Sequence, residues 1–291
     1  MDNGIAGSGC ERLLPQSARR PLPEIERAII KSHRKELWSG FTRAVRDFQL
    51  ISPGDRVAVG LSGGKDSLLL SKLMQELQRH GPVPFGLEFI AMDPGWHPAN
   101  RALLEENCAY LNIPVTVFET DIFDVVGGIS REYPCYLCAK MRRGALYSQA
   151  KRMDCNKLAL AHHFDDVIET TMLNLLYCGT VKTMLPKLHA QNFEGLELIR
   201  PLYYVREADI RRFILSAGIS PMDCGCAVAA KKTASKRREV KELIAALNEK
   251  IPGADAHIFN APRNVDMFGT LGWKKGKERR SFLDDYGERP V

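Results

Sequence analysis

A glycine-rich segment, Ser62–Ser67 (Ser-Gly-Gly-Lys-Asp-Ser), joins the apolar run Val57–Leu61 to a stretch of helical character. Glycine allows the backbone unusual dihedral angles and lets it approach a ligand closely. The free N–H groups at the start of a helix, together with the helix dipole, attract anions. Lys65 and the two serine hydroxyls add further donors. The segment therefore predicts a loop that binds phosphate groups.

This loop differs from the Walker phosphate-binding loop. The Walker pattern requires a glycine five residues before the Gly-Lys pair and a serine or threonine after the lysine. Here those positions hold Val59 and Asp66. A carboxylate next to a phosphate site requires a cation between them, and Mg²⁺ is the expected ion. Lys65 and Asp66 are the first candidate catalytic residues.

Short apolar runs alternate with helical patterns along most of the chain. Strand-like and helix-like segments at this spacing predict an α/β fold, with a doubly wound parallel sheet and helices on both faces. An amphipathic helix is expected within 23–49 and another helix near the end, so the fold carries N- and C-terminal helical additions. The predicted strands are 57–61, 87–92, 115–118, 157–161 and 196–199. The predicted helices are 66–79, 100–111, 139–152, 165–177, 207–217 and 236–250.

Polar residues gather where predicted strands end, and open α/β sheets bind ligands beyond the carboxyl ends of their strands. Asp93 follows the second strand, and His162-His163-Phe164-Asp165-Asp166 follows the fourth. We expect Asp93 and His162 to contact the nucleotide and Asp165 or Asp166 to hold or orient Mg²⁺. The two aspartates could instead simply stabilise a helix N-terminus. Arg143 is a candidate bidentate phosphate ligand, or part of a basic helix face.

The eight cysteines are too few for a disulfide scaffold in 291 residues, so their spacing matters more than their number. Cys135 and Cys138 form C-x-x-C, and Cys224 and Cys226 form C-x-C. Three thiolates suit an iron–sulfur cluster with one open iron, whereas four suit zinc or a closed cluster. A redox-active pair is a third interpretation. Spacing alone leaves zinc and iron–sulfur open.

Basic residues cluster late in a chain with 41 Lys and Arg against 35 Asp and Glu. One cluster comprises Lys231, Lys232, Lys236, Arg237 and Arg238, and a second spans 274–280. Such clusters can neutralise nucleic-acid phosphates, although a solvated helix face has the same composition. No apolar run approaches the roughly 20 residues of a membrane span. The first residues also lack a secretion-signal core, so we expect a cytoplasmic protein with no membrane partner.

The order of the motifs resembles that of the tRNA 2-thiocytidine synthetases, the TtcA-like branch of the PP-loop ATP pyrophosphatase superfamily. The resemblance covers residues 35–262. It rests on SGGKDS, the C-x-x-C followed by Ala-Lys-Met-Arg-Arg-Gly, Ala-His-His-Phe-Asp-Asp, Arg-Pro-Leu and a late cysteine. The resemblance implies that Ser62–Ser67 binds ATP with Mg²⁺ and that ATP is cleaved between its α- and β-phosphates. It also implies a [4Fe-4S] cluster on Cys135, Cys138 and Cys226, with Cys224 as the alternative third ligand.

The same resemblance implies the reaction and its partners. An anticodon-loop cytidine of tRNA would be adenylylated and then thiolated to 2-thiocytidine, with release of AMP and pyrophosphate. Sulfur would come from a cysteine desulfurase or another donor. Lys231, Lys232, Lys236, Arg237 and Arg238 would bind the tRNA. The segment 227–235 departs from the family pattern, so the geometry around the third cysteine is the least determined.

The predicted organisation has five parts. They are a flexible segment 1–22, a helical region 23–52, the PP-loop domain 53–220 with a C-x-x-C insertion, a cysteine-containing segment and helix 221–265, and a basic tail 266–291. Two other functions stay open: another PP-loop tRNA-modifying enzyme (a uridine thiolase or lysidine synthetase), and a zinc-stabilised RNA-binding protein without activity. The oligomeric state is also open, a homodimer included.

Overall fold

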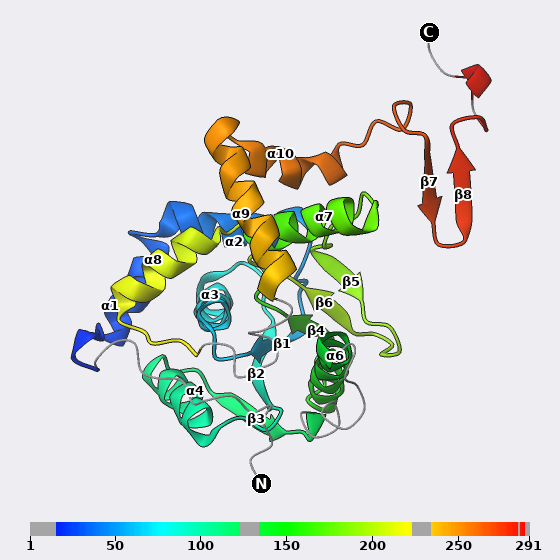
Figure 1. The fold of residues 1–291 in the computed structure, drawn as a ribbon. Helices are drawn as coiled ribbons and strands as arrows, with labels where there is room; N and C mark the ends of the chain where they lie inside the picture. Colours follow the sequence, from blue (N-terminus) through cyan, green and yellow to red (C-terminus); the bar gives the residue numbers. More distant parts are fainter. Residues whose placement is uncertain (1–15, 123–133, 223–233, 285, 289–291) are drawn as a thin grey trace.

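The computed structural model describes residues 16–122, 134–222, 234–284 and 286–288. Its centre is a six-stranded sheet with the order β3-β2-β1-β4-β6-β5 (Figure 1). Neighbouring strands pair in parallel, except that β5 runs antiparallel to β6. The strands are β1 Arg56–Leu61, β2 Gly86–Asp93, β3 Val115–Glu119, β4 Lys157–Ala159, β5 Lys187–His189 and β6 Glu197–Ile199. The predicted doubly wound α/β fold is confirmed, with the strand order reversing between β1 and β4.

The helices cover both faces of this sheet. Side chains alternate along β1: Val57, Val59 and Leu61 join the core that contains α3, whereas Ala58 joins the core on the α6 side. Helices α7, α9 and α10 pack together over one end of the sheet (Figure 1). The helices are α1 Leu22–Ile30, α2 Ser39–Asp47, α3 Lys65–His80, α4 Pro98–Tyr110, α6 Pro134–Arg152, α7 Phe164–Cys178, α8 Glu207–Ala217, α9 Ala234–Lys250 and α10 Ala254–Asn260. Within the described ranges, none of them is long and apolar enough to cross a membrane.

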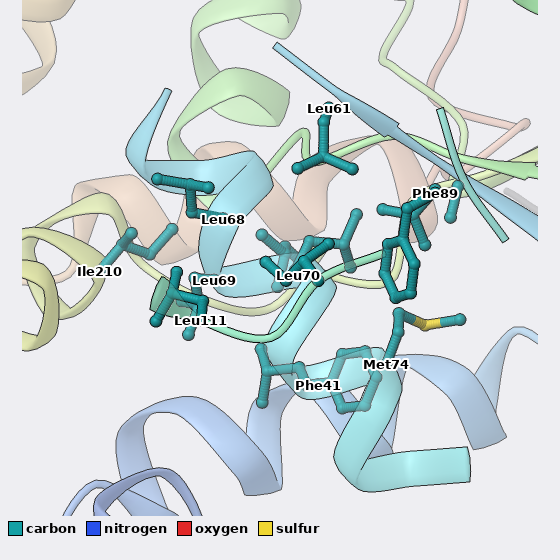
Figure 2. Packing of buried hydrophobic residues seen from close by; sticks show 14 of the residues in the cluster. Phe41, Leu61, Leu68, Leu69, Leu70, Met74, Phe89, Leu111 and Ile210 are labelled. Carbon is teal, nitrogen blue, oxygen red and sulfur yellow. The ribbon is translucent and has the colours of Figure 1, made fainter. Parts of the chain in front are cut away.

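Helix α3 forms the centre of the largest hydrophobic core. Figure 2 shows Leu68, Leu69, Leu70 and Met74 of this helix among side chains from other elements. Those neighbours include Phe41 of α2, Phe89 of β2 and Ile210 of α8. Because α3 begins directly after the glycine loop, this packing fixes the loop against the body of the protein.

The single amphipathic helix expected within 23–49 is in fact divided. A π-helical turn, Arg34–Trp38, separates α1 from α2. Ile29 and Leu37, eight positions apart, are both buried, so the buried face continues across the break.

Other elements differ from expectation at the edges of the fold. Helix α6 begins at Pro134 rather than near residue 139, so Cys135 and Cys138 lie in its first turn. The three-residue strand β5 and helix α10 were not predicted from the sequence. The expected basic tail contains a hairpin of β7 Gly272–Lys275 and β8 Glu278–Ser281, with all eight residues exposed. These elements are short or solvent-exposed, and therefore leave little hydrophobic periodicity.

Candidate functional site

The glycine loop lies at the carboxyl end of β1, next to the point where the strand order reverses. Gly63 adopts φ +80°, in the left-handed region that favours glycine. A β-carbon on Gly63 would lie 2.4 Å from Met222 Sδ, so the position also has no room for a side chain. The amide of Met222 donates a hydrogen bond to the Gly63 carbonyl over 2.9 Å. The loop is thus fixed in shape by a residue distant in sequence.

Two serine hydroxyls close the loop from within. Ser67 Oγ donates to the Gly64 carbonyl over 2.9 Å and accepts from the Ser62 amide over 3.2 Å. Ser62 Oγ lies 3.2 Å from Ser67 Oγ and accepts from the Gly64 amide over 3.3 Å. Ser67 is 2 % exposed, so it supports the loop from beneath. Ser62, by contrast, is exposed.

Lys65, the first residue of α3, makes two ion pairs. Its Nζ lies 3.0 Å from Asp66 Oδ2 and 3.1 Å from Glu207 Oε1. Burial alone would lower the pKa of Lys65, but the charges of Asp66 and Glu207 outweigh it and raise that pKa. Lys65 is therefore a permanent cation at the mouth of the loop.

The first turn of α7 brings the predicted carboxylates to the same site. His163 is the N-cap of α7, and its backbone amide donates to Asp166 Oδ2 over 3.0 Å. The buried His163 ring stands between the two helices. Its Nε2 lies 3.8 Å from Asp66 Oδ1 and 3.5 Å from Asp166 Oδ2, and its Nδ1 lies 3.6 Å from Asp165 Oδ2. The first turns of α3 and α7 therefore face each other across one imidazole.

Arg237 of α9 lies against this group of carboxylates. Its guanidinium contacts Asp166 Oδ1 at 2.8 Å and Glu169 Oε2 at 2.7 Å. Burial would raise the pKa of Asp166, but the charges of His163 and Arg237 hold it below its ordinary value. The sequence predicts that Arg237 binds RNA; in the structure this residue also balances the charge of the site.

Glu207, the first residue of α8, was not identified from the sequence. Besides Lys65, its carboxylate pairs with Lys241 and, at 2.8 Å, with Arg211. Burial would raise its pKa, yet the hydrogen bond from Lys241 and the charge of Lys65 keep that pKa far below its ordinary value. The Glu207 amide also donates to Asp165 Oδ2 over 2.7 Å. No sequence spacing marks this residue; only the folded sheet brings it to the loop.

The carboxylate oxygens of the site differ in whether a protein group already donates a hydrogen bond to them. Asp165 accepts from the Glu207 amide, and both oxygens of Asp166 have protein partners. Asp66 Oδ1, by contrast, is buried without a hydrogen-bond partner in the structure. No group of three or more His, Cys, Asp or Glu side chains is arranged to hold a metal ion in the part of the chain that is described. An ion here would therefore draw its other ligands from substrate and water.

Asp93 and His162 also lie at strand ends. The Asp93 carboxylate accepts from the Gly95 and Trp96 amides over 2.9 and 2.7 Å, so it shapes the turn after β2. Burial and the charge of Arg200 lower the pKa of His162 to about 4. Arg143 lies on α6, near enough for its charge to help burial lower the pKa of Arg200 to about 10.

The predicted cluster ligands and part of the predicted RNA surface lie outside what the structure describes. This holds for Cys224, Cys226, Lys231 and Lys232, and for the side chains of Cys135 and Cys138. The remaining predicted RNA ligands besides Arg237 lie on α9. Lys236 Nζ is 4.9 Å from the centre of the Tyr177 ring, and the exposed Arg238 pairs with Glu242 of its own helix at 2.9 Å.

Comparison with known proteins places this geometry in a family. The PP-loop domain model ATP_bind_3 matches residues 38–222. The tRNA-cytidine(32) 2-sulfurtransferase of Pelobacter propionicus is 38% identical over 225 residues, which cover 77% of this chain and 83% of that protein. The Geobacter metallireducens enzyme of the same name is 36% identical over 237 residues, covering 81% and 91%.

A solved structure agrees on the fold. The U34-tRNA thiolase of Methanococcus maripaludis, determined with its [4Fe-4S] cluster, aligns with a TM-score of 0.62 at 23% identity. The alignment covers 78% of this chain and 77% of the thiolase. With the domain match over the glycine loop and the extent of the sequence identity, the chain belongs to the PP-loop family, in the branch of the tRNA-cytidine(32) 2-sulfurtransferases.

Proposed function

We propose that the protein is an ATP-dependent tRNA sulfurtransferase that converts an anticodon-loop cytidine to 2-thiocytidine. The observation that carries the proposal is the glycine loop at the open N-terminus of α3, with Lys65 and Asp66 beside it, in a chain of this family. The relatives' names specify cytidine 32 of tRNA. That position in the anticodon loop is the expected target, because unpaired bases can leave the stack and enter an active site.

In the proposed reaction the ATP phosphates lie over Gly63 and Gly64. The oxygen on C2 of the cytidine attacks the α-phosphorus, pyrophosphate leaves, and the base becomes adenylylated. Lys65 exchanges its contacts with Asp66 and Glu207 for the phosphate oxygens and offsets the developing charge. A sulfur nucleophile then attacks C2, and AMP leaves. Glu207 keeps its pairs with Lys241 and Arg211 throughout, so its charge stays balanced while Lys65 moves.

A magnesium ion fits beside Asp66. Its Oδ1 is a buried acceptor with no hydrogen-bond partner, and hard carboxylate oxygens are the ligands Mg²⁺ prefers. The ion would supply charge neutralisation at the β- and γ-phosphates. Asp166 would orient the ion from one step further out, because both of its oxygens already accept from Arg237 and the His163 amide. Asp165 uses Oδ2 for the Glu207 amide and could hold or orient the ion through its other oxygen.

A [4Fe-4S] cluster fits the cysteines by donor type and by chain path. Cys135 and Cys138 are three residues apart in the sequence, near the start of α6. Met222, which is hydrogen-bonded to Gly63, precedes Cys224 by two residues in the sequence. The ligands would be Cys135, Cys138 and Cys226, or Cys224 in its place. When bound, the cluster would supply an open coordination position for sulfur from a cysteine desulfurase.

The products of ATP cleavage test the nucleotide chemistry. With tRNA and a sulfur source, the protein should release AMP and pyrophosphate, and Lys65→Ala or Asp66→Ala should suppress turnover without lowering iron content. ADP and phosphate as products would contradict the assignment. In a deletion strain, tRNA should lack 2-thiocytidine. Loss of a thiouridine instead would indicate the uridine-thiolating alternative.

Metal analysis after anaerobic purification tests the cysteines. Cys135→Ala and Cys138→Ala should abolish iron and sulfide content while ATP binding persists, because the two sites lie on separate segments. Only one of Cys224→Ala and Cys226→Ala should have the same effect. Zinc in place of iron, with no visible absorbance and no ATP turnover, would support the RNA-binding alternative.

A further inference from the structure

A cavity of about 390 Å³ lies beside the nucleotide site, between α2, the start of α7, the loop before α8, and α10. Three arginines from three different elements line it: Arg43, Arg206 and Arg263. Its apolar walls are aromatic, formed by Phe164, Tyr204 and Phe259. Among the described residues, the glycine loop contributes nothing to the lining, and the function proposed above does not account for the residues that do.

Each guanidinium is held in place by an aromatic ring. Arg43 lies 4.2 Å from the centre of the Tyr204 ring, and Arg206 lies 4.5 Å from the centre of the Phe164 ring. Arg263 donates from Nη1 to Tyr204 Oη over 3.2 Å. An arginine stacked on a ring keeps its in-plane N–H groups free for other acceptors. Much of the entropy cost of ordering these long side chains is therefore met before any ligand binds.

The charges of the cavity are unbalanced. Arg206 pairs with Asp255, and Asp47, the acidic residue in the lining, pairs with Arg46 at 3.1 Å. Among the described residues, Arg43 and Arg263 have no carboxylate within ion-pair distance. Two oriented guanidinium groups without acidic partners, at the rim of one hollow, form a site for an anion with several acceptor oxygens.

We propose that this cavity binds backbone phosphate of the tRNA next to the nucleotide that reacts. The inference rests on the proposed function, since it takes tRNA as the substrate. Phosphodiester groups present the oxygens that guanidinium forks recognise, and an unstacked base can lie on the outer face of an arginine.

The cavity is also well placed. Phe164, in its wall, stands between His163 and Asp165 of the catalytic group, and Arg206 directly precedes Glu207.

The test is the salt dependence of tRNA binding. In the Arg43→Gln/Arg263→Gln variant, binding of the tRNA substrate should weaken about tenfold. The slope of log K against log salt should fall by about one unit for each phosphate that the variant no longer neutralises. The Arg43→Lys/Arg263→Lys variant keeps the charge and should keep most of the slope. Neither variant should change the Kd for ATP. Both arginines are exposed, and thermal unfolding checks that each variant is folded.

Arg212→Gln is the matched control. This arginine is exposed on α8, pairs with Asp209 at 3.1 Å and does not line the cavity. The double variant removes two positive charges and the control removes one. A loss of log K in the control of half that in the double variant would therefore reduce the effect to net charge and overturn the proposal. Weaker binding of inorganic phosphate or ATP, with tRNA unaffected, would assign the cavity to a free anion and overturn it as well. If wild-type protein binds no tRNA, the proposed function fails; if only the variants are unchanged, the cavity assignment alone fails.

Discussion

The first turns of α3 and α7 face each other across His163, yet they are built in different ways. The turn of α3 is formed mainly by adjacent residues: Gly63 supplies the backbone conformation, and Ser62 and Ser67 supply the hydrogen bonds that close the loop. Met222 adds one backbone hydrogen bond to Gly63 from far along the chain. The turn of α7 is completed by residues far along the chain. Asp165 depends on the amide of Glu207, and Asp166 depends on Arg237.

The difference separates two requirements of the site. A loop that binds phosphate must present backbone N–H groups in one fixed shape, and a contiguous motif can specify that shape. A group of carboxylates held close together must be stabilised by cations, and those can come from any element that packs nearby. Substitutions in α3 should therefore act through shape, and substitutions around α7 should act through charge.

The largest effect should come from Gly63→Ala. Alanine at φ +80° is strained, and its β-carbon would lie 2.4 Å from Met222 Sδ and 3.2 Å from Met222 Cβ, so the loop or Met222, which is bonded to it, must shift. We expect ATP turnover to fall about 100-fold, the loss typical of an ångström-scale displacement.

Gly54→Ala is the control for strain alone, because Gly54 has φ +84° with no atom within 4 Å of the new β-carbon. It should cost about 1 kcal/mol of unfolding free energy and leave turnover unchanged. Equal turnover in the two variants would refute the shape argument for α3.

A smaller effect is expected from Glu207→Gln, which links the two turns. Lys65, Lys241 and Arg211 would lose their shared carboxylate, and Lys65 would be held by Asp66 alone. We expect turnover to fall about tenfold because Lys65 is less well oriented. Asp209→Asn, on the same helix but paired with the exposed Arg212, should change turnover little. Steady-state ATP turnover on both variants decides whether the link matters.

The same contrast explains what could be predicted from sequence. The five parallel strands and the strand–loop–helix unit around Ser62–Ser67 were correctly predicted, because strand–loop–helix patterns are local. Glu207 was missed, and Arg237 was assigned only to RNA, because an ion pair between residues 71 positions apart leaves no mark in the spacing. The π-helical turn at 34–38 was missed since it changes helix rotation without changing composition.

Arg237→Gln should have a few-fold effect on turnover and a distinct effect on its pH dependence. Arg237 helps hold the pKa of Asp166 below its ordinary value. Without that charge the pKa should rise, so Asp166 becomes protonated at higher pH and the acid limb of turnover shifts upward. Arg238→Gln, which affects only an exposed pair with Glu242, should leave the limb in place. If both variants have the same pH–rate profile, Arg237 does not act on Asp166, and RNA binding is left as its predicted role.

The smallest expected effect is on the free energy of unfolding, through its dependence on pH near the start of α7. Burial and Arg200 lower the pKa of His162, the residue before the α7 N-cap, to about 4. The unfolded chain takes up this proton near pH 6.5, whereas the folded chain does not until about pH 4. Unfolding free energy should therefore fall as the pH drops through that window. Asp166, whose pKa is depressed, loses its contribution only as the pH falls below the ordinary carboxyl range, so the two windows are distinct.

His162→Asn removes this titrating group. The decline in unfolding free energy between about pH 6.5 and 4 should therefore become smaller by about 1–2 kcal/mol. This is less than the full pKa shift would give, because the ring is partly exposed. Urea unfolding at several pH values measures it. Lys65→Met, in the turn of α3, is the matched comparison. The raised pKa of Lys65 lies far above this window, so that variant should keep the wild-type slope. If unfolding free energy depends on pH equally in wild type and His162→Asn, the acid sensitivity does not arise from His162.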